Sequence, residues 1–138
     1  MIQFAHHSNL FQDYSNQDLS GKDFRKASIR GANFSGSKAA GVSFFSCFAE
    51  RSKMVGVDMS NSDLELASFD DADLTNAILQ GAFVTGASFK DVILTGSDWT
   101  DVILRKDTYQ MLCTNPTATG TNPVTGADTR ESLNCPPL

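Results

Sequence analysis

The feature that most constrains this chain is a repeat of five residues. Positions 14 to 104, taken in steps of five, define nineteen centres, and seventeen of them carry a large apolar or aromatic side chain. The position two residues before a centre is mostly small or β-branched, as in the run Ala72, Ala77, Ala82 and Ala87. A polar residue usually stands between these two positions, and Gly or Asn often ends the unit. The unit therefore reads small, polar, large, polar and turn-forming, and it recurs at a fixed period.

A period of five excludes a helix. Five helical steps rotate a side chain by about 140°, so the large residues would be spread around the axis. The glycines that recur from Gly21 to Gly96 would each cost about 1 kcal/mol inside helices. A coil whose sides are five residues long instead turns one large and one small residue inward on every side, with Gly or Asn at the corner. The pattern therefore predicts an all-β solenoid.

Residues 12–106 resemble the pentapeptide-repeat family, whose consensus is Ala-(Asp/Asn)-Leu-x-x. The segments "ANFSG", "ASFDD", "ADLTN" and "ASFKD" are near-ideal copies. The resemblance implies a right-handed quadrilateral β-helix of nearly five coils, with four units per coil and residues 20 apart stacked on one another. Large residues then form inward ladders, such as Phe24, Phe44, Leu64 and Val84.

Two centres break the rule, because Ala39 and Ala49 are small where a large residue is expected. Phe45 and Phe48 lie close by in the sequence. We expect local repacking in which Phe45 or Phe48 supplies the lost volume; a ligand cavity is the alternative.

The chain is predicted to be a single domain, 1–138, with a cap at each end of the β-helix, because an open stack exposes its core and its strand edges. Residues 1–11 carry apolar side chains out of phase with the repeat and predict an N-terminal cap. Residues 107–138 predict a short helical C-terminal cap and a tail. Asp107 is a candidate helix N-cap, and Asp128 with Glu131 has capping-box spacing for one more helical turn.

The three cysteines have separate interpretations. Cys113 and Cys135 flank a tail with hardly any core of its own, and we expect them to form a disulfide that contributes about 3 kcal/mol. The alternative is two free thiols. A metal site is disfavoured because no second Cys pair or His lies at ligand spacing. Cys47 occupies a small inward position and is expected to be an inert core residue.

The tail carries a second resemblance. Its segments "RKDTYQMLC" and "GTNPVTGADTRESLNC" are similar to those of a cyanobacterial and chloroplast group of thylakoid-lumen pentapeptide-repeat proteins. This resemblance implies a thylakoid-lumen or periplasmic setting and no established biochemical activity, and a disulfide would favour an oxidising compartment. The N-terminal "MIQFAHHSNL" lacks the features of a secretory signal. A cytoplasmic location is therefore the alternative to a removed targeting segment. No run approaches the roughly 18 apolar residues of a membrane span, so membrane insertion is not expected.

The outward position before the centre, normally polar, is apolar in several units. These include the candidate surface residues Ile78, Phe83, Ile93 and Ile103. In the four-sided coil that the resemblance implies, Phe83 and Ile103 stack on one wall. Exposed apolar patches usually have a covering partner. Either the C-terminal tail folds back over the Phe83 and Ile103 wall, or the wall docks a partner or a second copy.

Charge is uneven along the chain. Residues 22–53 carry a balance of +5 and residues 54–101 a balance of −8, while the whole chain is at −5. The overall acidity argues against nucleic-acid binding, which needs clustered Lys and Arg. The bipolar distribution indicates either ordinary solvated faces or a means of orienting a partner.

Catalysis finds little support in the sequence. His6 and His7 have no Ser, Cys or carboxylate partner at fixed spacing, and the repeated aspartates would not converge on a convex prism. The glycines follow the corner rhythm rather than a phosphate-binding loop. We therefore expect no enzyme, no cofactor and no metal.

The leading functional hypothesis is a non-enzymatic structural or protein-interaction module, a monomeric prism that presents flat faces to an unidentified protein partner. The alternative, implied by the family resemblance, is a DNA-mimicking DNA gyrase-binding protein. That role would want a long, uniformly acidic rod, usually dimeric, whereas this chain is short and bipolar.

Overall fold

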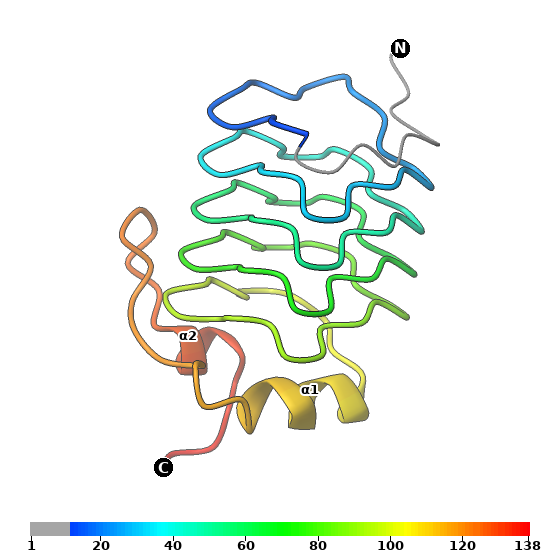
Figure 1. The fold of residues 1–138 in the computed structure, drawn as a ribbon. Coiled ribbons are helices and arrows are strands. Elements are labelled where there is room, and N and C mark those ends of the chain that lie inside the picture. The colour runs from blue at the N-terminus through cyan, green and yellow to red at the C-terminus, as the bar shows by residue number, and fades with distance from the viewer. Residues whose placement is uncertain (1–11) are drawn as a thin grey trace.

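The structure is a computed structural model that describes residues 12–138. They form a four-sided stack of coils, with the helix α1 (Lys106–Cys113) beneath it and a tail that includes α2 (Thr129–Ser132) alongside its last coils (Figure 1). The N-terminal cap expected at residues 1–11, together with His6 and His7, lies outside the described residues.

A regular parallel ladder joins the coils. Fourteen parallel β-bridges occur among the described residues, from Asp13↔Asn33 to Ile78↔Asp98, and each joins residues 20 apart. The bridging residue is always the one before a centre. Four pentapeptides therefore make one coil, and every outward side chain stacks on its equivalent in the next coil.

All the corners share one backbone conformation. The second residue after each centre, from Asn16 to Asp101, has a positive φ between 56° and 78°. Ten of these eighteen described corner residues are not glycine, and they include Lys26, Arg51 and Leu66. An L-residue in this left-handed region costs roughly 1 kcal/mol, so the ladder imposes the conformation even where the side chain disfavours it.

The polar residue before each centre has a structural task. Where it is Asp or Asn, its Oδ1 accepts a hydrogen bond from the backbone N–H two residues later, as in Asp58 to Ser60 (3.0 Å) and Asp98 to Thr100 (2.9 Å). This turn is typical of Asp and Asn, and it starts the corner that follows the centre. Selection for the corner therefore explains the many regularly spaced aspartates without any catalytic role.

The core contains the inward ladders. In its first coils, Tyr14 stacks on Phe34 with ring centroids 4.8 Å apart, and Phe24 stacks on Phe44 at 5.2 Å. Phe34 and Phe44 also meet edge to face at 6.0 Å, in the coil where Ala39 and Ala49 are the other two centres. The two alanines thus stand in the same coil as rings that reach across the prism.

The expected filling by Phe45 or Phe48 is therefore wrong. Phe48 points outward and is 44% exposed, and the Arg30 guanidinium lies 4.8 Å from its ring centroid. Phe45 is half-buried at a corner. The residue before a centre faces outward in this ladder whatever its hydrophobicity, because the backbone register sets the direction of its side chain.

At the C-terminal end the chain leaves the ladder. Asp98 is the last residue in a parallel bridge, and α1 follows from Lys106. The N-cap of α1 is Arg105 and not Asp107, which lies in the first turn, where the helix dipole favours an acidic side chain. Leu112 of α1 is fully buried against the core, as are Ala118 and Leu133 of the tail.

The tail is held by a covalent link and by hydrogen bonds. A disulfide joins Cys113 to Cys135, and Cys47 is a free buried cysteine. Asp128 caps α2 by accepting from the Glu131 N–H at 3.0 Å. The tail also bonds to the edge of the last coil, because Thr119 O accepts from Gly96 N–H at 2.8 Å and Thr117 Oγ1 accepts from Leu94 N–H at 2.9 Å.

Candidate interaction surface

The C-terminal tail covers the face that carries Ile78. Asn122 of the tail sits at one corner of this face, where its Nδ2 donates to the carbonyl oxygens of Asn76 (3.1 Å) and Gly96 (3.0 Å). At the other end Ser132 of α2 accepts a 2.9 Å hydrogen bond from Trp99 N–H. Beneath this span Ile78 is only 8% exposed. Figure 1 shows the tail loop beside α2 running along one side of the stack.

The neighbouring face carries Phe83 and Ile103, and no part of residues 12–138 covers it. Phe83 is 59% exposed and Ile103 is 90% exposed. The prediction that the tail folds over the Phe83 and Ile103 wall is therefore wrong. The physical reason is that the bonds from Asn122 and Ser132 hold the tail on the preceding face, around Ile78.

A shallow pocket separates Phe83 from Ile103. Its volume is about 150 Å³, and it is lined by Gly81 to Thr85 on one side and by Asp101 and Ile103 on the other. The pocket exists because the chain leaves the ladder here: Asp63 and Phe83 are bridged, but Phe83 and Ile103 are not. We call Phe83, Ile103 and these lining residues the Phe83 pocket.

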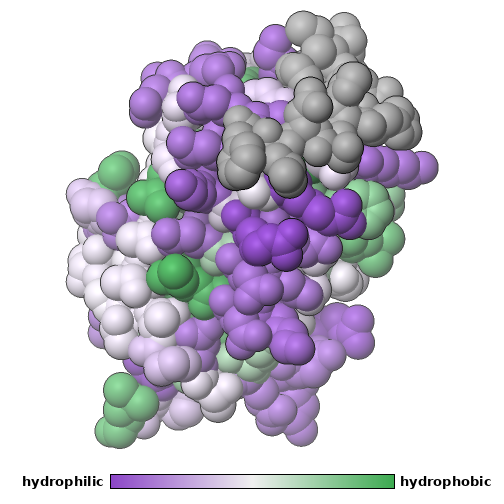
Figure 2. Space-filling view, viewed as in Figure 1, coloured by the Kyte–Doolittle hydropathy of each residue, from purple (hydrophilic) through white to green (hydrophobic). Residues whose placement is uncertain are grey.

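The remaining candidate, Ile93, stands apart from this pocket. It is 42% exposed and follows a different corner of the coil, on the face that begins at Val92. The structure thus brings together only Phe83 and Ile103 of the four predicted surface residues. Figure 2 shows hydrophobic residues as separate patches on an otherwise mainly polar surface.

The units with apolar outward residues give up a stabilising contact. An Asp or Asn before the centre accepts a backbone N–H in the turn that follows, and an Ile or Phe cannot. At Ile78 the loss coincides with burial under the tail, whereas at Phe83 and Ile103 nothing in residues 12–138 covers the side chain. Because such a hydrogen bond is worth about 1 kcal/mol, these two apolar residues bring no folding advantage of their own.

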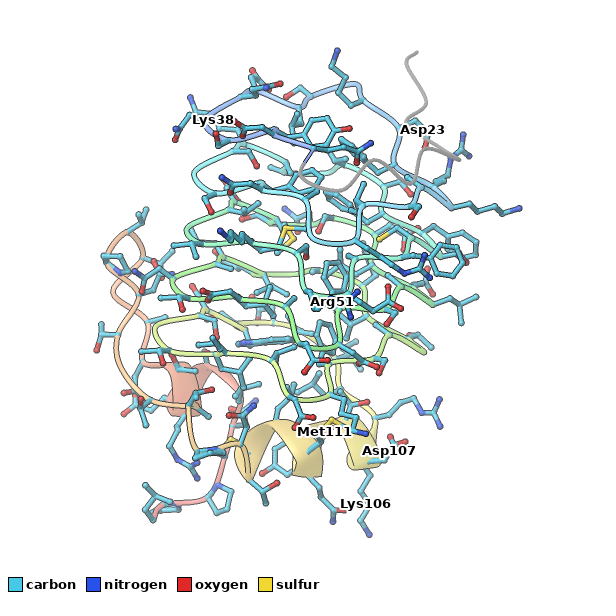
Figure 3. The ribbon with its side chains drawn as sticks, in the orientation of Figure 1. Asp23, Lys38, Arg51, Lys106, Asp107 and Met111 are labelled. Carbon is cyan, nitrogen blue, oxygen red and sulfur yellow. A yellow bond between two sulfur atoms is a disulfide. The ribbon has the colours of Figure 1, made fainter. Side chains whose placement is uncertain are left out.

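Charged side chains occur at the surface from the first coils down to α1 (Figure 3). Figure 3 labels Asp23 and Lys38 on the first coils, Arg51 further down the stack, and Lys106, Asp107 and Met111 along α1. Asp23 and Arg25 form a 2.6 Å ion pair, and hydrogen bonding from the guanidinium lowers the pKa of the Asp23 carboxyl. Asp101 is the charged residue that lines the Phe83 pocket.

The pKa shifts of the titratable groups in residues 12–138 have structural causes. Burial raises the pKa of the Cys47 thiol and keeps it protonated in the core. The pKa values of Asp13 and Asp18 are lowered chiefly by hydrogen bonds from the hydroxyls of Ser15 and Ser20, which belong to the corners. Among residues 12–138 no group of three or more His, Cys, Asp or Glu side chains could hold a metal ion.

The outward-position rule missed four exposed large apolar residues among residues 12–138: Leu66, Met111, Val124 and Leu138. Leu66 is 58% exposed at a corner with φ of 60°, where a Gly or Asn would be expected. Met111 is 43% exposed on α1. An apolar residue at a corner position is a signal in the sequence that could have identified Leu66.

The family of the chain follows from these observations and from comparison with known proteins. The family model described as pentapeptide repeats matches in 8 copies, at residues 15–44, 49–81 and 67–105. The chain therefore belongs to the pentapeptide-repeat family, whose members fold as right-handed quadrilateral β-helices and serve as structural or interaction modules.

Solved structures place this chain near photosynthetic relatives. It is similar to a pentapeptide repeat protein from the thylakoid lumen of Arabidopsis thaliana, with 38% sequence identity, a TM-score of 0.73, and coverage of 90% of this chain and 88% of the other. A pentapeptide repeat protein from the cyanobacterium Cyanothece 51142 shares the fold at 22% identity and a TM-score of 0.57, with 75% and 78% of the chains covered. The search of curated sequences returned no match.

Neither α1 nor α2, the helices within residues 12–138, is long and apolar enough to cross a membrane.

Proposed function

We propose that this protein is a non-catalytic protein-binding module of an oxidising compartment, the thylakoid lumen or the periplasm, and that the Phe83 pocket is its docking surface. The prism acts as a monomeric rigid support that holds this pocket in place. The observation that carries the proposal is the contrast between Ile78 and Phe83. Both occupy the same outward position in consecutive units, yet the tail covers the first and leaves the second 59% exposed.

The contrast is informative because the C-terminal tail covers one outward apolar residue, Ile78, and leaves Phe83 exposed. An exposed apolar pair on a small protein favours association with another molecule. Phe is also one of the residue types enriched at the centres of protein interfaces. The single charged side chain that lines the pocket, Asp101, would orient the partner rather than supply most of the binding energy.

The compartment is supported by two independent features. The Arabidopsis relative, 38% identical over most of both chains, is from the thylakoid lumen. The Cys113–Cys135 disulfide suits an oxidising setting, because disulfides seldom persist in the reducing cytoplasm. Alkylation of thiols in intact cells, followed by mass spectrometry, tests this point: both cysteines should escape alkylation until a reductant is added. Full alkylation without reductant would support the cytoplasmic alternative.

The docking role is tested by site-specific crosslinking. A photo-reactive phenylalanine analogue is placed at Phe83 and, as a matched control, at Ser68, which occupies the equivalent outward position on another face. In extracts of the native compartment, the analogue at position 83 should capture a discrete protein. Capture should fall when Ile103→Asp is added. Equal products from positions 83 and 68, or none from either, would contradict the proposal.

The charge distribution argues against the alternative role, gyrase binding by DNA mimicry. The first coils carry most of the basic residues of the chain, with a balance of +5 over residues 22–53, and duplex DNA has no such end. A gyrase supercoiling assay decides between the two roles. Inhibition at micromolar protein that survives Phe83→Asp would overturn the docking proposal in favour of gyrase binding.

A further inference from the structure

The strand edge above the Phe83 pocket is unpaired. In the second and third coils, three backbone groups on this wall bond to the next coil. In the third coil these groups are the Ser62 carbonyl, the Leu64 N–H and the Leu66 N–H. Their partners are Phe83 N–H (3.0 Å), Phe83 O (2.8 Å) and Thr85 O (3.0 Å).

The equivalent groups of the following coil are the Ala82 carbonyl, the Val84 N–H and the Gly86 N–H. Among the hydrogen bonds formed by residues 12–138, none involves any of these three groups. Their ladder partners would be Ile103 and Arg105, but the chain turns away there to begin α1 at Lys106. The last residue to take its place on this side of the ladder is Thr100, whose carbonyl accepts from Gly81 N–H at 2.9 Å.

The other side of the same rim shows how this molecule pairs such an edge. At Leu94 and Gly96 the following coil is also missing, and the tail supplies the acceptors. Thr119 O accepts from Gly96 N–H at 2.8 Å, and Thr117 Oγ1 accepts from Leu94 N–H at 2.9 Å. The tail thus supplies one backbone carbonyl and one side-chain hydroxyl to N–H groups near the Leu94 wall. On the opposite wall, at Ala82–Gly86, no segment of residues 12–138 does so.

We infer that an extended segment of the partner protein completes the ladder at Ala82–Gly86, running parallel to it. This inference rests on the docking role proposed above and names the kind of partner. One partner residue donates its N–H to Ala82 O and accepts from Val84 N–H, and the carbonyl two residues later accepts from Gly86 N–H. Addition of a strand to a free sheet edge is an established mode of peptide recognition, in which the main chain provides affinity and side-chain pockets provide specificity.

The Phe83 pocket specifies the side chain of this segment. The ladder register places the first paired partner residue next to Phe83, as Phe83 itself lies next to Asp63. The pocket between Phe83 and Ile103 has a volume of about 150 Å³, and Ala82, Phe83, Val84 and Ile103 give it a largely apolar lining. The paired residue should therefore be a large aliphatic or aromatic one.

The test uses the full chain and a phage-displayed library of random dodecapeptides, with counter-selection on Phe83→Asp. Selected peptides are synthesised and then N-methylated at one residue at a time. Strand pairing predicts that methylation of the residue paired with Ala82 weakens binding about tenfold, and that methylation of the next residue leaves it nearly unchanged. Backbone amide exchange provides a second readout. Val84 and Gly86 should slow about tenfold with saturating peptide, whereas Leu64 and Leu66, already bonded to Phe83 and Thr85, should not change.

The outcomes separate this inference from the docking role. Peptides that depend on Phe83 but show no dependence on the methylated position, with Val84 and Gly86 unprotected, would overturn strand addition and leave the docking role intact. Failure to select any Phe83-dependent peptide, while the crosslinker at Phe83 still captures a protein, would also overturn strand addition and leave the docking role intact. Protection that rises with protein concentration alone, without peptide, would identify a second copy as the occupant and also overturn the inference.

Discussion

Asn122 in the C-terminal tail donates a 3.0 Å hydrogen bond from Nδ2 to the carbonyl oxygen of Gly96 in the last coil. The same amide group reaches Asn76 O in the coil above at 3.1 Å, and Oδ1 accepts from the N–H groups of Val124 and Thr125. The side chain is 1% exposed. One buried amide thus joins the tail to two consecutive coils and shapes the turn of the tail itself.

Replacement of this amide should loosen the tail. We expect Asn122→Ala to lower the free energy of unfolding by about 1–3 kcal/mol, because it leaves buried carbonyls without a donor. Val124→Ala is the control: this side chain is 78% exposed, and its loss should change stability by less than about 0.5 kcal/mol. Urea unfolding followed by tryptophan fluorescence measures both, since Trp99 bonds to the tail through Ser132. Equal midpoints for the two variants would contradict the assignment.

Two corner glycines with nearly the same φ should differ in their tolerance of alanine. At Gly96 (φ 72°) an added Cβ would lie 2.0 Å from Asn76 Oδ1 and 3.4 Å from the Thr121 carbonyl oxygen, whereas at Gly56 (φ 67°) it would meet nothing within 4 Å. Gly56→Ala should cost about 1 kcal/mol for the left-handed conformation alone. Gly96→Ala should cost more, because Asn76 must move and the tail lies close. Differential scanning calorimetry should show the larger fall in melting temperature for Gly96→Ala.

Ile78 and Phe83 should respond differently to the same substitution. Ile78→Asp places a carboxylate under the tail and should destabilise the protein by several kcal/mol, about 2–4. Phe83→Asp should leave the free energy of unfolding unchanged or raise it by up to about 1 kcal/mol, since the ring is 59% exposed and an Asp at this position accepts a backbone N–H in the corner. Thermal unfolding by circular dichroism measures both, and size-exclusion chromatography with light scattering confirms that the assembly state is unchanged. A large loss at Phe83 would show that another part of the chain covers it.

Removal of the disulfide should release the tail before the coil unfolds. The double change Cys113→Ala and Cys135→Ala opens a loop with a sequence separation of 22, and the chain-entropy model assigns that closure about 3 kcal/mol. Limited proteolysis should then cut between residues 113 and 135 at protease levels that leave the wild type intact. Cys47→Ala is the control, because Cys47 is buried in the coil and pairs with neither. It should not increase cleavage in the tail.

The Asp23–Arg25 pair should make stability fall at acid pH. Hydrogen bonding from Arg25 lowers the pKa of the Asp23 carboxyl below its ordinary value of 3.8. Its contribution is therefore fully present above pH 3.8 and is lost as the pH falls through the lower folded-state pKa. Asp23→Asn should be less stable than the wild type near neutrality, and the difference should shrink between pH 4 and pH 2. A stability difference that stays constant over this range would refute the coupling. Arg25→Gln should reduce the pH-dependent part without removing it, because the backbone N–H of residue 25 still donates to Asp23.

The pattern of five residues was sufficient to predict the coil. Each unit repeats the same local preferences, so the inward positions and the corners can be read without knowledge of distant contacts. The partner of each ladder residue lies a fixed 20 residues away, so one period also sets the tertiary register. The two half-cystines could be paired because few groups in the tail compete for that role. The left-handed corners at Lys26, Arg51 and Leu66 carry no such local signal, and the ladder on both sides imposes them.

The place of the tail was decided only by the tertiary structure. Locally, Ile78 and Phe83 are indistinguishable, since both are apolar residues in the same position of consecutive repeats. The tail covers one and not the other because of a few contacts between non-repeating side chains and distant backbone groups, such as Asn122 with Asn76, 46 residues away. Such contacts do not recur at a fixed spacing, so the repeat pattern does not indicate which residues form them. By itself the sequence determined the prism and its inward ladders, whereas the free edge at Ala82–Gly86 exists only because the folded chain leaves the ladder before Ile103 can pair.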